Sequence, residues 1–270
     1  MVEIENKYKI GVRRFGLINW VGAFSLYKKE VLRFIIVSGQ TLLGPILTSI
    51  LFLIVISLAI GDERSNVLGV PYIEFLANGL IMMQVIQQSF SHSSSSLMMS
   101  KMMGTIVDIV SSPLSAAEVT ISLVLASITR GLCIASISTF IFVIFLDLSI
   151  HNYFLWFLYI ILAGFFLGSA GIIAGLYADK FDQMATVTNF VIVPLSFLSG
   201  TFYSIEKLPN ILKTLSYYNP FFHMIDGFRY SFLGQSDGSI KFGIIFLTII
   251  SIFTWYISYL LFRRGYKIKS

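Results

Sequence analysis

The chain has 270 residues and a formal net charge of +5; 56% of its residues are apolar and only 12% are charged. Soluble domains carry about 25% charged residues, so this composition excludes a soluble enzyme. Nucleic-acid binding is excluded as well, because the basic residues gather near the ends of the chain and avoid the long apolar stretches. We expect an all-α integral membrane protein.

Six apolar segments are long enough to cross a bilayer, whose hydrocarbon core takes about 20 helical residues. In chain order these predicted spans are residues 35–60, 72–99, 119–146, 153–178, 182–203 and 241–262. The second span is polar in its middle. An even number of spans places both termini on one side of the membrane, and we expect residues 1–270 to form a single transmembrane domain.

The positive charges indicate which side this is. Thirteen of the nineteen Lys and Arg residues lie on the side of the termini, in residues 1–34, in the tail 263–270, and in the short loops that hold Lys101 and Lys180. Because cytoplasmic loops carry an excess of Lys and Arg, both termini are predicted to be cytoplasmic.

An amphipathic helix is predicted before the first span. Aromatic and aliphatic side chains recur there every three or four residues, at Trp20, Phe24, Tyr27, Val31 and Phe34. Three basic side chains point elsewhere, namely Lys28, Lys29 and Arg33. This pattern is typical of a helix that lies in the membrane interface. The alternative is a simple extension of the first span.

The segment 204–240, between the fifth and sixth spans, is too apolar for an ordinary loop. Asn219 is a good N-cap, Pro220 suits the first helical position, and Gly234 suits a left-handed end. A helix of about 14 residues is about 21 Å long, which is too short to span. We therefore expect a re-entrant or interfacial helix, with Leu208–Tyr218 as its partner.

The loop Ser100–Glu118, between the second and third spans, holds a second predicted short helix. Gly104, the amphipathic turn Ile106–Val110 and the break at Pro113 favour a helix that lies along the membrane. It is either an ordinary connector or the docking element of a transporter that a separate motor drives.

Polar side chains inside spans are costly and face protein or water. Arg130 is the one charge deep in a span, and it either lines a pathway or joins helices through hydroxyls and carbonyls. Gln84 and Gln88 belong to the polar stretch of the second span, where a substrate path and hydrogen bonding between helices are both open.

The sequence lacks the usual marks of an enzyme. It has no P-loop string, so the chain is not expected to bind nucleotide itself, and its three histidines have no metal-ligand spacing. Ser169 stands in a Gly-Ser-Ala-Gly string, but the sixth span has no histidine to activate it, so an intramembrane hydrolase is a weak alternative. The glycines around Ser169 favour close helix packing instead. Cys133, the single cysteine, fits a core position.

Several strings resemble the ABC-2 type permease family, the membrane subunits of bacterial ATP-binding cassette exporters. They are QTLLGPILTSILFLIV after the basic amphipathic start, the loop GTIVDIVSSPLSAAE, and PLSFLSGTFYSIEKLP ahead of NPFFHMIDGFRYSFLG. The last two are the most specific, and the resemblance covers nearly the whole chain.

The resemblance implies two copies of the chain around one pathway in the bacterial inner membrane, with separate ATPase subunits that bind ATP on the cytoplasmic side. Gly104, Asp108, Pro113 and Glu118 would belong to the coupling helix that contacts the ATPase, and the helix from Asn219 to Gly234 would be the outer gate. There Asp226 and Arg229 share a helix face, and we interpret Arg229 as structural or gating.

The substrate stays open among a drug-like molecule, a lipid and a polysaccharide or lipid-linked glycan. An ion-coupled secondary transporter or channel is the alternative function. It would need carboxylates within the membrane, and the predicted span cores contain none.

Overall fold

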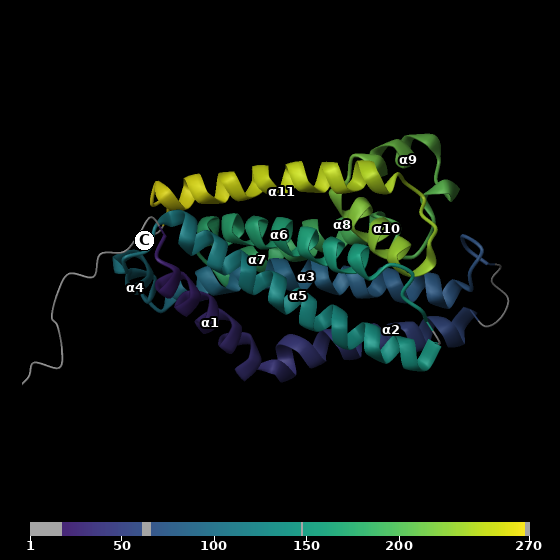
Figure 1. Ribbon diagram of the computed structural model, residues 1–270, viewed down its shortest axis with the longest axis horizontal. Helices are drawn as coiled ribbons and strands as arrows, with labels where there is room; N and C mark the ends of the chain where they lie inside the picture. Colours follow the sequence, from purple (N-terminus) through teal and green to yellow (C-terminus); the bar gives the residue numbers. More distant parts are fainter. Residues whose placement is uncertain (1–17, 61–65, 147, 268–270) are drawn as a thin grey trace, which may run out of the picture.

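The computed structural model describes residues 18–60, 66–146 and 148–267. Four long helices run side by side along the longest axis of the molecule (Figure 1). They are α3 (Tyr72–Met102), α5 (Ala116–Leu146), α6 (Tyr153–Tyr177) and α11 (Ile240–Arg263). Residues 1–17 of the predicted cytoplasmic segment and 268–270 of the predicted tail lie outside the described residues.

Helix α3 forms the centre of the bundle. It packs against α5 and α6, and α6 in turn packs against α11. Glycines on α6 allow these close approaches: a Cβ on Gly164 would lie 3.0 Å from the Cα of Ile128 on α5, and a Cβ on Gly171 only 2.5 Å from the carbonyl oxygen of Phe90 on α3. The predicted packing role of these glycines is therefore confirmed. They allow α6 to approach two helices, α5 and α3.

Five helical segments are both long and apolar enough to cross a membrane: Gly39–Ala59, Ala116–Leu146, Tyr153–Tyr177, Phe181–Leu198 and Ile240–Arg263. They correspond to five of the six predicted spans. The remaining one, 72–99, falls on α3, which has 31 residues and is about 46 Å long. Its glutamines and serines make α3 less apolar than the other five, and most of these polar side chains are buried against neighbouring helices.

The first span begins later than predicted, at Gly39 and not at residue 35. Ile35 and Ile36 still belong to α1 (Trp20–Ile36), and a π-helical turn, Gly39–Leu43, leads into α2 (Gly44–Ile60). The Thr41 hydroxyl donates to the carbonyl oxygen of Phe34 at 2.6 Å. Because this bond satisfies a carbonyl that the end of α1 leaves free, the chain can change direction between α1 and α2.

The predicted apolar face of α1 divides into two parts. Trp20 and Phe24 are 72% and 64% exposed, whereas Phe34 is buried against His92 of α3. Leu26 and Glu30 join Phe34 on the buried side. The helix therefore turns one side toward α3 and α5, and leaves its first aromatic side chains on the outside of the bundle.

The fifth span ends earlier than predicted, at Leu198 and not at residue 203. It consists of α7 (Phe181–Val187), a π-helical turn, Thr188–Ile192, and α8 (Val193–Leu198). Pro194 cannot donate a backbone hydrogen bond, and the widened turn directly before it accommodates this loss. Gly200 has a φ of +77°, a left-handed conformation that favours glycine and turns the chain after the helix.

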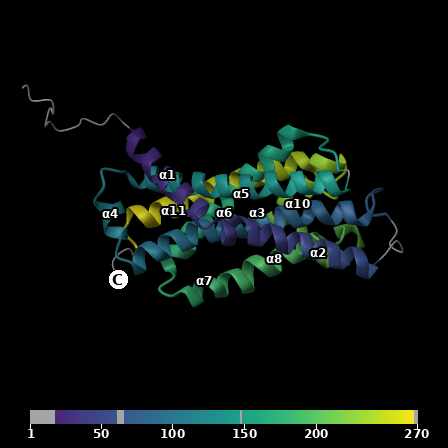
Figure 2. The same ribbon diagram turned by 90° about the horizontal axis from the view of Figure 1, so that it is seen from below.

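The two ends of the bundle differ. The short helix α4 (Ile106–Ser111), the start of α1 and the end of α11 lie at one end (Figure 1). Helices α9 (Asn210–Tyr217) and α10 (Pro220–Leu233) lie at the opposite end. Seen from below, α7 and α8 form one edge of the bundle, and α1 and α5 lie toward the other (Figure 2).

Candidate functional site

The loop after α3 forms the predicted short helix, α4. Gly104 has a φ of +72°, which lets the chain turn at the end of α3. Ile106 and Ile109 are buried, while Val107 and Asp108 point outward and are exposed. A helix of six residues with one buried side and one exposed side can lie on the end of the bundle and offer its outer side to a partner.

This loop is joined to the start of α1 by hydrogen bonds. Glu118 accepts from the backbone N–H of Asn19 at 2.5 Å, and the Asn19 side-chain amide donates to the carbonyl oxygen of Pro113 at 3.0 Å. Ser115 and Glu118 also form a reciprocal capping box at the start of α5: Ser115 N–H donates to Glu118 at 2.6 Å, and Glu118 N–H donates to the Ser115 hydroxyl at 3.3 Å. Asn19, which the sequence analysis did not single out, thus connects α1, the α4 loop and α5.

At the other end of the bundle, the predicted ends of α10 are confirmed. The Asn219 side chain accepts from Phe221 N–H, Pro220 is the first helical residue, and Gly234 ends the helix with a φ of +67°. Asn219 also donates to the Ser199 hydroxyl at 2.8 Å, which ties α10 to the turn after α8. Nearly all of α10 is buried, so it belongs to the packed end of the bundle.

Asp226 and Arg229 share α10, but each has partners outside that helix. Asp226 accepts from the backbone N–H groups of Asp237 and Gly238, both at 2.9 Å. Arg229 donates to the carbonyl oxygen of Gly200 at 2.7 Å and lies 3.6 Å from the centre of the Phe75 ring. Burial raises the pKa of Asp226 to about 6, although the positive charge of Arg229 opposes this shift. Arg229 therefore holds the turn before α10, and Asp226 holds the loop after it, at the same end of the bundle.

Arg130 lies between three helical segments and is 6% exposed. Its guanidinium donates to the Gln88 side-chain oxygen on α3 and, at 3.3 Å, to the Thr41 carbonyl oxygen in the π-helical turn. Gln84, one turn before Gln88, is also buried. Arg130 thus joins α5 to α3 and to the π-helical turn through an amide and a carbonyl, and its Nε atom has no hydrogen-bond partner among the described residues. A pathway role for Arg130, Gln84 and Gln88 stays a prediction.

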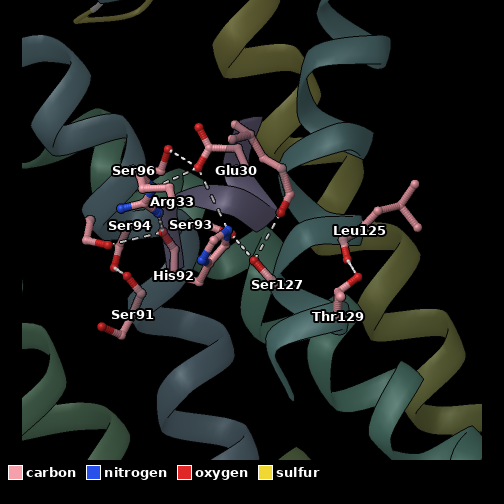
Figure 3. A network of polar contacts seen from close by, with 12 residues as sticks. Glu30, Arg33, Ser91, His92, Ser93, Ser94, Ser96, Leu125, Ser127 and Thr129 are labelled. Carbon is pink, nitrogen blue, oxygen red and sulfur yellow. Dashed lines mark hydrogen bonds and ion pairs between the residues drawn. The ribbon is translucent and has the colours of Figure 1, made fainter. Parts of the chain in front are cut away.

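A second polar cluster, between α1, α3 and α5, was missed by the sequence analysis (Figure 3). Glu30 is 1% exposed and accepts from Arg33 at 3.0 Å and from the Ser96 hydroxyl at 2.7 Å. His92 Nε2 lies 3.8 Å from the same carboxylate, and Arg33 also donates to the His92 carbonyl oxygen. Glu30 directly follows Lys28 and Lys29 and precedes Arg33, so the basic residues around it concealed a buried acid in the sequence.

The same cluster explains much of the polar stretch on α3. Ser93 hydrogen-bonds to Ser127 of α5 (Figure 3). Ser89 donates to the Ser127 carbonyl oxygen at 3.5 Å. Tyr27 of α1 is 2.9 Å from the Thr129 hydroxyl of α5. Hydroxyl groups therefore find partners across helix contacts, in another hydroxyl or in a backbone carbonyl, as polar groups in a membrane protein do.

Two enzymatic features were considered from the sequence, an activated serine and a metal site. Ser169 is buried, and its hydroxyl donates to the carbonyl oxygen of Phe165, four residues earlier, at 2.7 Å. This backbone bond is an ordinary helix contact and does not activate a nucleophile. Within residues 18–60, 66–146 and 148–267, no group of three His, Cys, Asp or Glu side chains could hold a metal ion.

An all-helical bundle with five apolar segments of spanning length, a central polar helix and an exposed short helix at one end is the architecture of a multi-pass membrane protein. Comparison with known sequences then identifies the family of this chain. Residues 22–233 match the family model of the ABC-2 type transporter, so the chain belongs to this family.

Two relatives illustrate the range of the family. The chain is 32% identical over 253 residues to the inner membrane transport permease YadH of Escherichia coli K12, which covers 93% of this chain and 98% of that protein. It is 24% identical over 263 residues to nodulation protein J of Neorhizobium galegae, with 92% and 94% covered. Both matches extend over nearly the full length, so they include both ends of the bundle.

Proposed function

We propose that the chain is the permease subunit of an ATP-driven exporter in a bacterial inner membrane, with α3 as its sixth span and both termini in the cytoplasm. The observation that carries this proposal is the hydrogen-bonded joint between Asn19, Pro113 and Glu118. It connects an exposed helix at the end of the bundle to two helices that enter the bundle. A push on α4 would therefore move α1 and α5 together.

The orientation is supported by charge and by arrangement. The α4 end of the bundle also holds the start of α1 and the end of α11, where Arg263 and Arg264 lie (Figure 1). By the positive-inside rule this is the cytoplasmic end. In this arrangement α9 and α10 face outward, where α10 would act as a re-entrant gate.

The motor would be a separate ATP-binding cassette subunit that docks on α4, because the chain carries no P-loop of its own. Two copies of the chain would form the pathway between them, as in exporters whose permeases are single six-span chains. The inner membrane location is supported by the similarity to the E. coli permease.

The substrate we propose is a drug-like molecule, a lipid, or a polysaccharide or lipid-linked glycan. A cavity of about 790 Å³ supports the apolar part of this proposal. Its walls come from α6, α8 and α9, with Phe166, Leu195 and Leu212 among the lining residues. Such a cavity has the size of a typical small-molecule site.

Co-purification with the ATPase tests the docking proposal. The chain would be co-expressed with a candidate ATP-binding cassette ATPase, sought among the neighbouring reading frames, and the ATPase retained on the tagged permease would be measured. We expect Val107→Ser with Asp108→Lys on α4 to abolish retention. The matched control is Ile211→Ser with Glu206→Lys, which changes the same kinds of exposed side chain at the opposite end of the bundle. Full retention in the α4 variant would refute the proposal.

Ion-coupled transport remains the second candidate because of one observation, the buried Glu30 beside His92. Arg33 and Ser96 already bind the Glu30 carboxylate, which favours a structural role. Uptake or efflux by reconstituted vesicles that contain no ATP, driven by a proton or sodium gradient alone, would support ion coupling. Its loss in Glu30→Gln, with correct folding, would assign the coupling site.

A further inference from the structure

One wall of the cavity described above is a single short segment of the chain. Residues 204–217 hold the 3₁₀ turn Ile205–Lys207 and α9, and we call them the α9 flap. Four side chains of the flap line the cavity: Leu208, Leu212, Leu215 and Ser216. The position of the flap therefore sets the shape of the cavity on this side.

The α9 flap lies at one end of the bundle and is exposed over most of its length (Figure 1). Helix α9 packs against α10 and against the turn that precedes it. On its outer side Ile211 is 77% exposed, and Asn210 and Thr214 are exposed as well. A surface segment with few buried contacts opens at a lower free energy than the core of a protein. The contacts at the two ends of the flap therefore decide how firmly it is held.

Asp237, in the loop between α10 and α11, contacts both ends of the flap. Its carboxylate accepts from the Ser204 hydroxyl at 2.6 Å and from Ile205 N–H at 3.1 Å. Its backbone carbonyl oxygen accepts from the Tyr217 hydroxyl at 3.3 Å. Ends that lie close together let a surface loop behave as one compact unit. One residue thus closes the base of the flap.

Asp237 is itself fixed to the bundle. Its backbone N–H and that of Gly238 donate to Asp226 of α10, both at 2.9 Å, and Asp226 is buried. This loop also lies close to α10, because a Cβ on Gly238 would be 3.1 Å from the Phe222 ring. The bonds that Asp237 forms with the flap therefore connect a fixed part of the bundle to an exposed segment.

Two further contacts hold the flap. The Tyr217 carbonyl oxygen is 2.8 Å from His223 Nε2 on α10, and the Ile205 side chain is buried. The end of the flap thus has a second polar contact with the bundle, and the start has an apolar one. Loss of the Asp237 carboxylate would weaken the start of the flap most, without leaving the flap permanently open.

We infer that Asp237 is a positioning residue, which holds the α9 flap as a wall of the cavity until its bonds to Ser204 and Ile205 break. Hydrogen bonds to a carboxylate are stronger than those between neutral groups, so these two matter more than the bond from Tyr217. When they break, the start of the flap moves away from the loop after α10 and the cavity widens. The inference rests on the proposed function in one respect, that substrate enters this cavity.

Cysteine labelling tests this inference. In a Cys133→Ala background, which removes the single cysteine, Ser216→Cys places a thiol on the cavity side of α9, where Ser216 is 7% exposed. The full-length chain would be labelled in detergent with a water-soluble maleimide, without any ATPase. We expect Asp237→Ala to increase the labelling rate about tenfold, because the rate follows the open population and two hydrogen bonds to a charged group are lost.

Two controls separate the flap from the rest of the fold. Glu206→Ala removes a negative charge from an exposed position on the flap and should leave the rate unchanged. A second reporter, Ser169→Cys, lies buried in α6 and should be labelled at the same slow rate with or without Asp237→Ala. Equal acceleration of both reporters would show a general loosening of the fold and would overturn the inference. An unchanged rate at Ser216→Cys would overturn it as well.

Ser204→Ala keeps the inference testable if Asp237→Ala does not fold. It removes one of the two bonds and should increase the labelling of Ser216→Cys about threefold, and an unchanged rate would again overturn the inference. In a folded double variant, Ser204→Ala should add nothing to Asp237→Ala, because the hydroxyl acts through the carboxylate. None of these outcomes depends on export. A chain that retains no ATPase would refute the docking proposal and leave the result for the flap intact.

Discussion

The backbone N–H of Asn19 donates to the Glu118 carboxylate at 2.5 Å, although 99 positions separate the two residues in the sequence. Asn19 is also the N-cap of α1, because its side-chain oxygen accepts from Gly22 N–H at 3.0 Å. One residue thus begins α1 and holds the start of α5. A substitution at Asn19 can therefore test two roles, the stability of α1 and the coupling of α1 to the α4 loop and α5.

Asn19→Ala is expected to lower the free energy of unfolding by about 1 kcal/mol through loss of the cap. It also removes the bond to Pro113. Asn152→Ala is the matched control, since Asn152 caps α6 through the same kind of bond, to Leu155 N–H at 3.0 Å. Both variants should unfold earlier in denaturant, but only Asn19→Ala should reduce substrate-stimulated ATP hydrolysis by the assembled transporter. Equal hydrolysis in the two variants would show that the Asn19 side chain is not needed to transmit motion through the joint.

Gly171→Ala should disrupt the contact between α6 and α3. The added Cβ would lie 2.5 Å from a backbone oxygen, which cannot move without displacing the helix. We expect a loss of about 1–3 kcal/mol in the free energy of unfolding, measured by denaturant titration in detergent. Gly39→Ala is the control, because nothing lies within 4 Å of the Cβ position there. Similar stability of both proteins would contradict the close packing.

Glu30→Ala should destabilise the protein because it leaves the buried Ser96 hydroxyl without its acceptor. The expected cost is about 1–3 kcal/mol for that unpaired group. Glu30→Gln keeps an acceptor oxygen and should cost less. Glu206→Ala, on an exposed segment, should change the midpoint of thermal unfolding very little. An unchanged midpoint for Glu30→Ala would mean that water replaces the lost contacts.

The attachment of the chain after α11 should depend on pH. Asp179, in the loop after α6, accepts from Lys267 at 3.0 Å, and this hydrogen bond holds the pKa of its carboxyl below the usual range. A carboxyl with a lowered pKa in the folded state stabilises the contact above its ordinary pKa of about 3.9. The contact is lost as pH falls through the lowered value.

Distances between spin labels at Lys180 and Arg264, in a Cys133→Ala background, would report this change. We expect the distance distribution to broaden in acid in the parent protein. Asp179→Asn should give the broad distribution at every pH, because its amide cannot form the charged pair. A narrow distribution in Asp179→Asn at neutral pH would show that the contact between the Tyr177 and Tyr266 rings holds the segment without the ion pair.

Features that depend on neighbouring residues could be predicted well. The ends of α10 follow from Asn219, Pro220 and Gly234, since capping acts within one helical turn. The starts and ends of the spans were less certain. The first begins at Gly39 and the fifth ends at Leu198, because apolar composition alone does not show where α1 leaves its contact with α3 or where the chain turns at Gly200.

The partners of polar side chains could not be predicted. The spacing of three between Asp226 and Arg229 suggests a pair within one helix, yet Asp226 binds the backbone after α10 and Arg229 binds the backbone before it. Glu30 looked like one charge among several on a basic helix, and the structure buries it beside His92, 62 positions away. Such contacts depend on how helices cross, which no local pattern contains.

By itself, the sequence determined that this chain belongs in a membrane and where most of its helices lie. Long helices with few charged residues are favourable only in the hydrocarbon core of a bilayer. It also placed the short helices at each end, through caps and breaks that act locally. Only the tertiary structure decided which polar groups meet, which side of α1 is buried, and that Asn19 joins α1 to the α4 loop. These depend on contacts between residues 60 to 100 positions apart, such as Asn19 with Glu118 and Glu30 with Ser96.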